Sequence, residues 1–310
     1  MRSNVPGILV TAILLTRGSA GVLAQEVPYG KGMTDANKER LVIDDMEDVA
    51  DWYCGSPVES KVSTSDQHVE QGKLAMKFAN VVDHTKGEKN YPIGWPRTGK
   101  DLVKAKLTDW SAYDFFECRI YVDTNRESLP GTPLGIGFYH SGHRRTSSFT
   151  LKEIRKDAWV KIVIPTAKLI DARDVRRVQF HISESNYKHG DRVDFYVDDM
   201  VLTRFVDPTV AELGVDRKIL YANDRRIIAI YKLMGHKNLD DVTVEFAIGQ
   251  GTGEPAATTT GKPNPQGELP LKINKRLAPG IYWARLGLRD AQGKLIDRKQ
   301  TEFRVIDGPF

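Results

Sequence analysis

Two short acidic segments, about 150 residues apart, constrain the fold of this chain more than any other feature. The first, Leu41–Trp52, has the sequence LVIDDMEDVADW, and the second, Asp194–Leu202, has the sequence DFYVDDMVL. Each has the pattern of a β-strand that ends in clustered carboxylates. Such carboxylates repel one another unless a cation or a basic side chain lies among them. We therefore expect the two segments to meet in space and to close one β-domain around a shared hard cation.

Between these segments the chain is rich in short β-type runs and lacks apolar periods of helical length. Turn clusters such as Pro130–Pro133 and Lys188–Asp191 separate the runs, and a short helical piece is expected only around Thr166–Ile170. This pattern predicts a sandwich or jelly roll. The expected strands are Lys73–Phe78, Phe115–Val122, Leu134–Tyr139, Ser147–Leu151, Trp159–Ile164, Arg177–Ile182 and Phe195–Val197.

The pattern pauses around Phe205–Thr209, where Pro208 marks a linker, and strand-like runs then resume. Asp290–Gly293 has the composition of a hairpin turn, and Gly249–Gly267 that of a long mobile loop. About a hundred residues with six or seven strands predict an immunoglobulin-like β-sandwich. The expected strands are Lys218–Tyr221, Arg226–Leu233, Val242–Ile248, Leu269–Ile273, Gly280–Leu288 and Thr301–Val305.

The N-terminus has the pattern of a secretory signal peptide, with Arg2 before the short apolar run Val5–Leu15 and small residues before Gln25. No stretch is long enough to span a bilayer, so we expect a secreted or periplasmic protein. Domains are predicted at residues 1–24 (signal peptide), 25–40 (N-terminal extension), 41–204 (jelly roll) and 211–310 (immunoglobulin-like). The formal charge of +4 gives no basic stripe for nucleic acid. Cys54 and Cys118 could be free or bridged.

Several motifs together resemble the galactose-binding-like jelly rolls of bacterial carbohydrate-binding modules. They are Ile43–Glu47 with Trp52, Gly72–Lys77, Asp109–Asp114, Trp159–Pro165 and Phe195–Met200. The resemblance covers about residues 40 to 204, and the C-terminal part resembles immunoglobulin-like modules of exported bacterial glycan-active proteins. One departure is Met46, where such modules have Phe before the first acidic ligand. The resemblance implies a structural calcium ion held by Glu47 with Asp198 or Asp199. Pairing of these acids with Lys73 or with arginines is the alternative.

A polysaccharide site needs flat aromatic surfaces for the apolar faces of sugar rings and polar side chains for hydroxyl groups. With Phe116, Cys118 and Ile120 pointing inward, Arg119 and Tyr121 point outward. The same alternation turns Gln179 and His181 outward, and Tyr139 and His140 end a third strand. We expect sugar to lie over the Phe115–Val122 and Arg177–Ser183 strands. The predicted ligand-binding residues are Tyr91, Trp95, Arg119, Tyr121, Tyr139, His140, Gln179 and His181.

The sequence thus favours a secreted protein that binds a polysaccharide or oligosaccharide through its jelly roll, without identifying catalytic residues. The alternative is a polysaccharide lyase or glycoside hydrolase on the same fold. Such an enzyme needs an acid or base and a cation that neutralises a uronate carboxylate. The residues that could supply these parts are Tyr139, His140, His143, Arg144, Arg145 and His181. No nucleophile elbow, zinc signature or phosphate loop is present in the sequence.

Overall fold

The structure, a computed structural model, describes residues 33–87, 94–142, 146–235 and 239–308. Over these ranges the chain is all-β, as predicted, and its strands form four sheets. The helical pieces described are short 3-10 helices, η1 (Asp35–Asn37), η2 (Thr166–Lys168) and η3 (Glu184–Asn186). None of these helices could cross a membrane. The predicted signal peptide, residues 1–24, lies outside the described residues.

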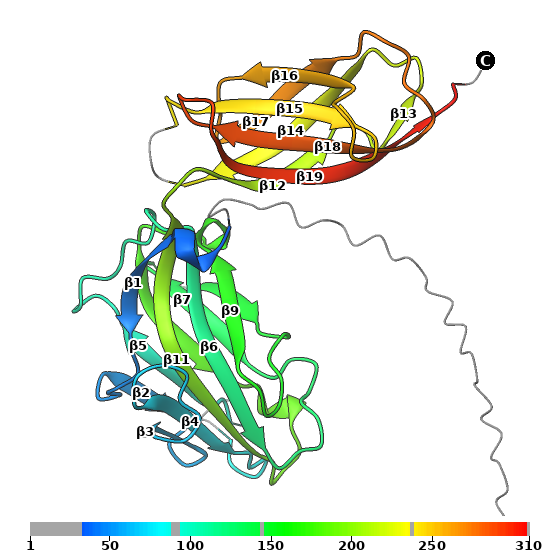
Figure 1. The fold of residues 1–310 in the computed structure, drawn as a ribbon. Helices are drawn as coiled ribbons and strands as arrows, with labels where there is room; N and C mark the ends of the chain where they lie inside the picture. Colours follow the sequence, from blue (N-terminus) through cyan, green and yellow to red (C-terminus); the bar gives the residue numbers. More distant parts are fainter. Residues whose placement is uncertain (1–32, 88–93, 143–145, 236–238, 309–310) are drawn as a thin grey trace, which may run out of the picture.

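The strands form two halves (Figure 1). Each half has its own hydrophobic core, one built from residues between Ile43 and Leu202 and the other from residues between Val210 and Val305. The predicted linker lies between them. Here the Asn37 side chain donates to the Asp207 carbonyl at 3.1 Å and accepts from the Asp207 N–H at 2.8 Å. Whether the two halves fold independently stays a prediction.

The N-terminal half is a sandwich of two antiparallel sheets, which we call sheet A and sheet B. Sheet A has the order β3-β4-β11-β6-β9, and β1 also pairs with β11. Sheet B has the order β2-β5-β10-β7-β8. The strands of sheet A are β1 (Lys38–Asp44), β3 (Ser60–Ser65), β4 (Ala75–Val81), β6 (Phe115–Thr124), β9 (Val160–Pro165) and β11 (Arg192–Phe205). Those of sheet B are β2 (Trp52–Gly55), β5 (Arg97–Asp101), β7 (Gly135–His140), β8 (Thr146–Thr150) and β10 (Val175–His181).

The core lies between the two sheets because their strands alternate inward apolar and outward polar residues. On β6, Phe116 and Cys118 are buried, and on β10, Val178 and Phe180 are buried in the same cluster. Both cysteines are free, and burial raises the pKa of the Cys118 thiol. Cys54 is half-buried, and its thiol lies 3.3 Å from the Ser60 carbonyl.

The two acidic segments meet in space, as expected from the sequence. β1 pairs antiparallel with β11, which places Leu41 opposite Leu202 and Asp44 opposite Met200. The other half of β11, up to Val197, pairs with β4. Asp198 and Asp199 lie where the partner strand on this side of β11 changes from β4 to β1. The pairing of β11 with β6 shifts register there, and Asp199 adopts a left-handed φ of 54°. Antiparallel pairing of the first and last strands closes the N-terminal sandwich.

The C-terminal half is also a two-sheet sandwich. One sheet has the order β12-β14-β17 and the other β13-β19-β18-β15-β16, with β13 parallel to β19. Its assignment as immunoglobulin-like stays a prediction. The strands are β12 (Thr209–Val215), β13 (Ile219–Tyr221), β14 (Arg226–Met234), β15 (Thr243–Gly249), β16 (Ala257–Gly261), β17 (Gln266–Lys272), β18 (Gly280–Arg289) and β19 (Leu295–Ile306).

One expectation for this half is wrong. The segment Gly249–Gly267 is not a long loop, because β16 pairs with β15 through its middle, with Thr259 opposite Phe246. β16 is an edge strand without a buried apolar face, so its threonine-rich sequence resembles a loop. Threonine nevertheless favours extended backbone because it is β-branched. The predicted turn at Asp290–Gly293 is present, with Gly293 at a φ of 76°.

Candidate functional site

The two sheets of the N-terminal sandwich turn the predicted ligand-binding residues to opposite sides of the molecule. Arg119 and Tyr121 lie on β6 in sheet A, whereas Tyr139, Gln179 and His181 lie on β7 and β10 in sheet B. The expectation that sugar lies over both the Phe115–Val122 and the Arg177–Ser183 strands is therefore wrong. The outward faces of two sheets that share a core point away from each other. We call these outward surfaces the sheet A face and the sheet B face.

The sheet B face carries side chains from neighbouring strands in register. Tyr53 on β2 is opposite Gly99 on β5, which is opposite Gln179 on β10, which is opposite Gly137 on β7. This row has an outward row on either side of it. In one of them, Arg97 on β5 is opposite His181 on β10. In the other, Arg177 on β10 is opposite Tyr139 on β7. Because alternate residues of a strand share a face, these side chains form one continuous surface.

Glycines at outward positions let the larger side chains lie flat against this sheet. A Cβ atom at Gly99 would come within 2.8 Å of the Tyr53 ring and 2.7 Å of the Val178 carbonyl oxygen. A Cβ at Gly55 would collide with the Arg97 side chain, and one at Gly135 with the His181 ring. The glycines therefore provide a floor on which Tyr53, Arg97 and His181 rest.

Hydrogen bonds and stacking fix the centre of the sheet B face. The Tyr53 hydroxyl donates to Gln179 Oε1, and Gln179 Nε2 donates to the Tyr139 hydroxyl at 2.9 Å. The Arg177 guanidinium lies over both tyrosine rings, 5.3 Å from the Tyr53 centroid and 5.8 Å from the Tyr139 centroid. Burial raises the pKa of Tyr53 above its ordinary 10, so its hydroxyl stays protonated even in mildly alkaline solution and keeps donating to Gln179. These four residues form one pre-organised group.

Trp95 forms one end of this surface. Its ring packs edge-on against His181, with centroids 5.7 Å apart, and the Arg97 guanidinium lies 4.8 Å from the Trp95 centroid. Trp95 is 39% exposed, so part of the indole is available to a ligand. His181 Nδ1 is buried without a hydrogen-bond partner, and burial lowers the pKa of this imidazole. The predicted stacking residue Tyr91 lies outside the described residues.

Sequence reasoning found Trp95, Tyr139, Gln179 and His181 but missed Tyr53, Arg97 and Arg177. A signal for each was present. Arg177 lies two residues before Gln179, and Arg97 lies two residues after Trp95. Tyr53 follows Trp52, which is buried in the core, so the alternation turns Tyr53 outward.

His140 does not share the sheet B face with Tyr139, because neighbouring residues of a strand point to opposite sides. His140 is 5% exposed, and its Nε2 lies 2.9 Å from Ser147 Oγ. Its Nδ1 lies 3.2 Å from the carbonyl oxygen of Asp174. These contacts fix the imidazole inside the protein, away from His181. The other members of the predicted catalytic cluster, His143, Arg144 and Arg145, lie outside the described residues.

The sheet A face carries many charges that are paired with one another. Glu117 is central: its side chain is 7% exposed and lies 2.6 Å from Lys38 Nζ and 2.8 Å from Lys161 Nζ. The Thr203 hydroxyl donates to the same carboxylate at 2.8 Å. Burial acts to raise the pKa of Glu117, but hydrogen bonds from Lys161 and Lys38 hold it below its usual value.

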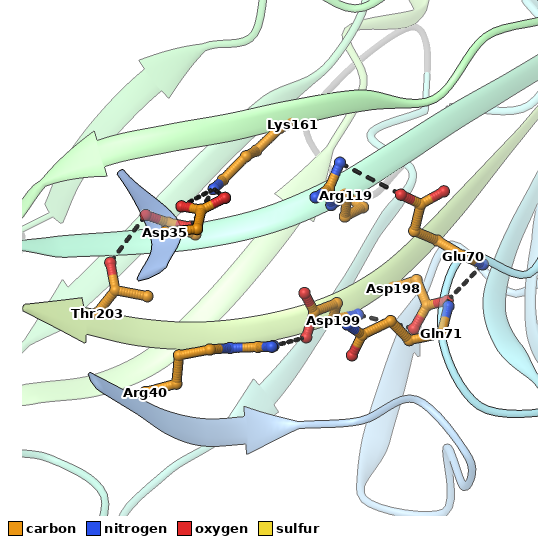
Figure 2. Close-up of polar contacts among 10 residues, drawn as sticks. Asp35, Arg40, Glu70, Gln71, Arg119, Lys161, Asp198, Asp199 and Thr203 are labelled. Atoms are coloured by element: carbon orange, nitrogen blue, oxygen red, sulfur yellow. Dashed lines mark hydrogen bonds and ion pairs between the residues drawn. The ribbon is translucent and has the colours of Figure 1, made fainter. Parts of the chain in front are cut away.

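The predicted ligand residues on the sheet A face are also engaged by the chain itself. Figure 2 shows Arg119 directed at Glu70, with which it forms a 3.2 Å ion pair. The Tyr121 ring is stacked under His68, with centroids 3.9 Å apart. Trp159 lies at the side of Tyr121, at 5.8 Å. The structure therefore places Arg119 and Tyr121 outward, as predicted, but in contacts that occupy their binding groups.

The predicted calcium ligands each have partners within the chain. Glu47 Oε1 accepts the backbone N–H of Lys73 at 2.6 Å, and Asp198 Oδ2 accepts that of Gln71 at 2.9 Å. Burial raises the pKa of Asp198, which these N–H groups oppose. Asp199 forms an ion pair with Arg40 (Figure 2). In the part of the chain that the structure describes, no three His, Cys, Asp or Glu side chains are grouped to hold a metal ion. These contacts leave calcium binding untested, and it stays a prediction.

No protein-family model and no curated protein matches the sequence. Solved structures with some similarity include the glycoside hydrolase domain of Endo-D from Streptococcus pneumoniae R6, with 12% identity and a TM-score of 0.28 over 82% of this chain. The chain spans only 37% of that structure. Another is the C-terminal family 22 carbohydrate-binding module of Clostridium thermocellum Xyn10B, with 12% identity and a TM-score of 0.31 over 52% of this chain and 91% of the module.

A third is a xylan-binding domain from Paenibacillus barcinonensis Xyn10C, with 11% identity and a TM-score of 0.32 over 54% of this chain and 92% of that domain. At such TM-scores and identities a structural similarity is not evidence of shared function. A function for this chain has to come from the residues of its own surface.

Proposed function

We propose that this protein is an exported carbohydrate-binding protein that recognises a polysaccharide on its sheet B face. The observation that carries the proposal is the group of Tyr53, Tyr139, Gln179 and Arg177, held together on a floor of glycines. Aromatic rings offer apolar surface to the C–H faces of a sugar, and the guanidinium offers hydrogen bonds to its hydroxyl groups, while the buried Gln179 amide positions the two tyrosines.

The group suits sugar binding because it is rigid before a ligand arrives. The hydrogen bonds through Gln179 restrain both tyrosines, so little side-chain freedom remains to be lost on binding. Neighbouring strands lie about 4.8 Å apart, so the five strands of sheet B extend about 19 Å across. A surface of that width with Trp95 at one end favours an extended oligosaccharide over a single sugar ring.

The remaining features fit the same proposal. The signal-peptide pattern of residues 1–24 supports export, and a polysaccharide outside the cell is accessible only to an exported protein. The C-terminal sandwich, which we propose to be immunoglobulin-like, would then act as a spacer or attachment module for the binding domain. Catalysis is the competing function, and it differs from binding by the release of products.

A matched pair of variants on the two faces tests the proposal. The full chain is screened against a glycan panel, once for binding and once for new reducing or unsaturated ends. We expect binding without products. Tyr53→Ala should then weaken binding of the best glycan at least about tenfold, since losing an aromatic anchor costs about 2 kcal/mol. Tyr121→Ala, on the sheet A face, is the control and should bind normally. Equal losses in both variants, or product release by the wild type, would overturn the proposal.

A further inference from the structure

The outward side chains of the sheet B face include more cations than carboxylates. Among the outward side chains of its five strands, as far as they are described, the cations are Arg97, Arg176 and Arg177; Arg176 is exposed at a register shift of β10 and pairs with Asp174 at 3.0 Å. The one carboxylate among them is Asp101, the last residue of β5. The remaining outward positions carry tyrosine, glutamine, histidine, serine, threonine or glycine. The face therefore presents fixed positive charge to a ligand, with its negative charge at the rim.

Arg177 is the central cation, and the chain does little to neutralise it. Its Nη2 lies 4.0 Å from Asp101 Oδ2, at the limit of an ion pair, and Asp101 is 49% exposed. The Arg177 Nε–H is buried and has no hydrogen-bond partner. The two tyrosine rings hold the guanidinium plane in place, and Arg177 also makes a side-chain hydrogen bond to Tyr53. The Arg177 side chain is nevertheless 42% exposed, so a guanidinium that is held rigidly and only weakly paired can meet an acceptor from outside the chain.

The sheet A face shows that this imbalance is not a general property of the sandwich. There Lys38 and Lys161 share Glu117 at 2.6 and 2.8 Å, and Arg119 lies 3.2 Å from Glu70. Every one of these basic groups has a closer carboxylate than Arg177 has. The same fold therefore pairs its cations on one side and leaves a rigid cation weakly paired on the other.

We infer that the glycan recognised by the sheet B face carries carboxylate groups, as in a polysaccharide that contains uronic acid. A planar guanidinium matches a carboxylate in a two-pronged hydrogen bond, and such charge-assisted bonds are stronger than those to neutral hydroxyls. Tyr53 and Tyr139, which Gln179 holds in place, then contact the ring that bears the carboxylate. This inference rests on the proposed function and adds the chemical class of the ligand.

The experiment compares each acidic polymer with its own uncharged form. Polygalacturonate, alginate and glucuronoxylan are tested beside their carboxyl-reduced counterparts, using the full chain at low and high salt. We expect at least one acidic polymer to bind about tenfold tighter than its reduced form, because a charge-assisted bond is lost on reduction. The preference should weaken as salt is raised.

Variants assign the preference to Arg177. Arg177→Gln should bind the acidic and reduced polymers equally, whereas Arg177→Lys should keep part of the preference because it keeps the charge without the fork. Arg119→Gln on the sheet A face should behave as wild type, and thermal melting confirms that each variant is folded. Equal binding of acidic and reduced polymers by the wild type, or a preference that survives in Arg177→Gln, would overturn the inference alone. Failure to bind any polysaccharide would instead overturn the proposed function.

Discussion

The two outer faces of the N-terminal sandwich are built from the same residue types but use them differently. On the sheet A face, Glu117 lies between Lys38 and Lys161, and the Tyr121 ring is covered by His68. On the sheet B face, Arg177 lies over two tyrosines without a close carboxylate. Both faces contain arginine, tyrosine and polar side chains at outward positions. Composition alone therefore does not separate a structural face from a binding face.

The difference lies in whether each group already has a partner. A charge that is paired within the chain contributes to the stability of the fold, and a ligand would have to break that pair. A rigid and exposed cation whose nearest carboxylate is 4.0 Å away, such as Arg177, gains a close anionic partner only when a ligand arrives. The comparison predicts that substitutions on the sheet A face change stability and that substitutions on the sheet B face change binding.

The largest effect is expected for Glu117→Ala. Removing this carboxylate leaves Lys38, which is 11% exposed, and Lys161, which is 28% exposed, with the exposed Asp35 as their shared carboxylate, at 3.2 and 3.1 Å. Breaking a buried ion pair on one side typically costs 3–5 kcal/mol, and the partial exposure of the lysines favours the lower end, about 3 kcal/mol. Urea or guanidinium unfolding measures this loss in the free energy of unfolding. Glycan affinity should not change.

The control for this substitution is Glu70→Ala on the same face. Glu70 pairs with Arg119, and both side chains are about 30% exposed, so the pair should contribute less than about 1 kcal/mol. A loss for Glu70→Ala as large as that for Glu117→Ala would show that burial does not decide the stability of the sheet A face.

Calcium removal should have the next largest effect. If Glu47 binds calcium together with Asp198 or Asp199, only the folded chain brings these ligands together, so the ion stabilises the fold by mass action. A hundredfold excess over the dissociation constant gives about 2.7 kcal/mol. We expect chelation to lower the melting temperature and Glu47→Gln to abolish that difference. An unchanged melting temperature on chelation, with no metal found by elemental analysis, would show that these acids are satisfied by backbone N–H groups and Arg40 without calcium.

The fold was largely predictable because it depends on local patterns. Alternation of apolar and polar residues identified β6 and β10, and the acidic motifs identified the pairing of β1 with β11. The prediction failed at β16, where an edge strand without a buried face carries no alternation. Sequence periodicity reports burial, so it identifies a strand only where one side of that strand is buried.

The site was less predictable because the local residue pattern of a strand does not determine its place in a sheet. Alternation correctly turned Arg119 and Gln179 outward, but it does not say which sheet each strand joins. Whether a charge is paired also depends on distant residues: Glu117 and Lys38 are 79 residues apart, and Arg119 and Glu70 are 49 apart. Tyr53 and Arg177 differ from Tyr121 and Arg119 only through such long-range contacts.

The smallest expected effect is a dependence of stability on pH. The contributions of the two faces to stability should be lost at different pH values. Burial lowers the pKa of His181 below its ordinary 6.5, so the unfolded chain binds this proton more readily than the folded chain. The stability contributed by neutral His181 is complete above pH 6.5 and is lost as the pH falls below that value. For one proton the slope cannot exceed about 1.4 kcal/mol per pH unit. His181→Gln should remove this part of the profile.

On the sheet A face the loss should begin at a lower pH. The pKa of Glu117 is held below its ordinary 4.5, despite burial, by the bonds from Lys161 and Lys38. Its contribution is therefore complete above that value and is lost as the pH falls through the lower pKa of the folded state. Urea midpoints measured across this range should show two losses, the first absent in His181→Gln and the second smaller in Glu117→Gln, because the pKa values of other carboxylates such as Asp35 are lowered too. If the first loss persists in His181→Gln, another group titrates in that pH range. The loss of stability would then not come from His181 on the sheet B face.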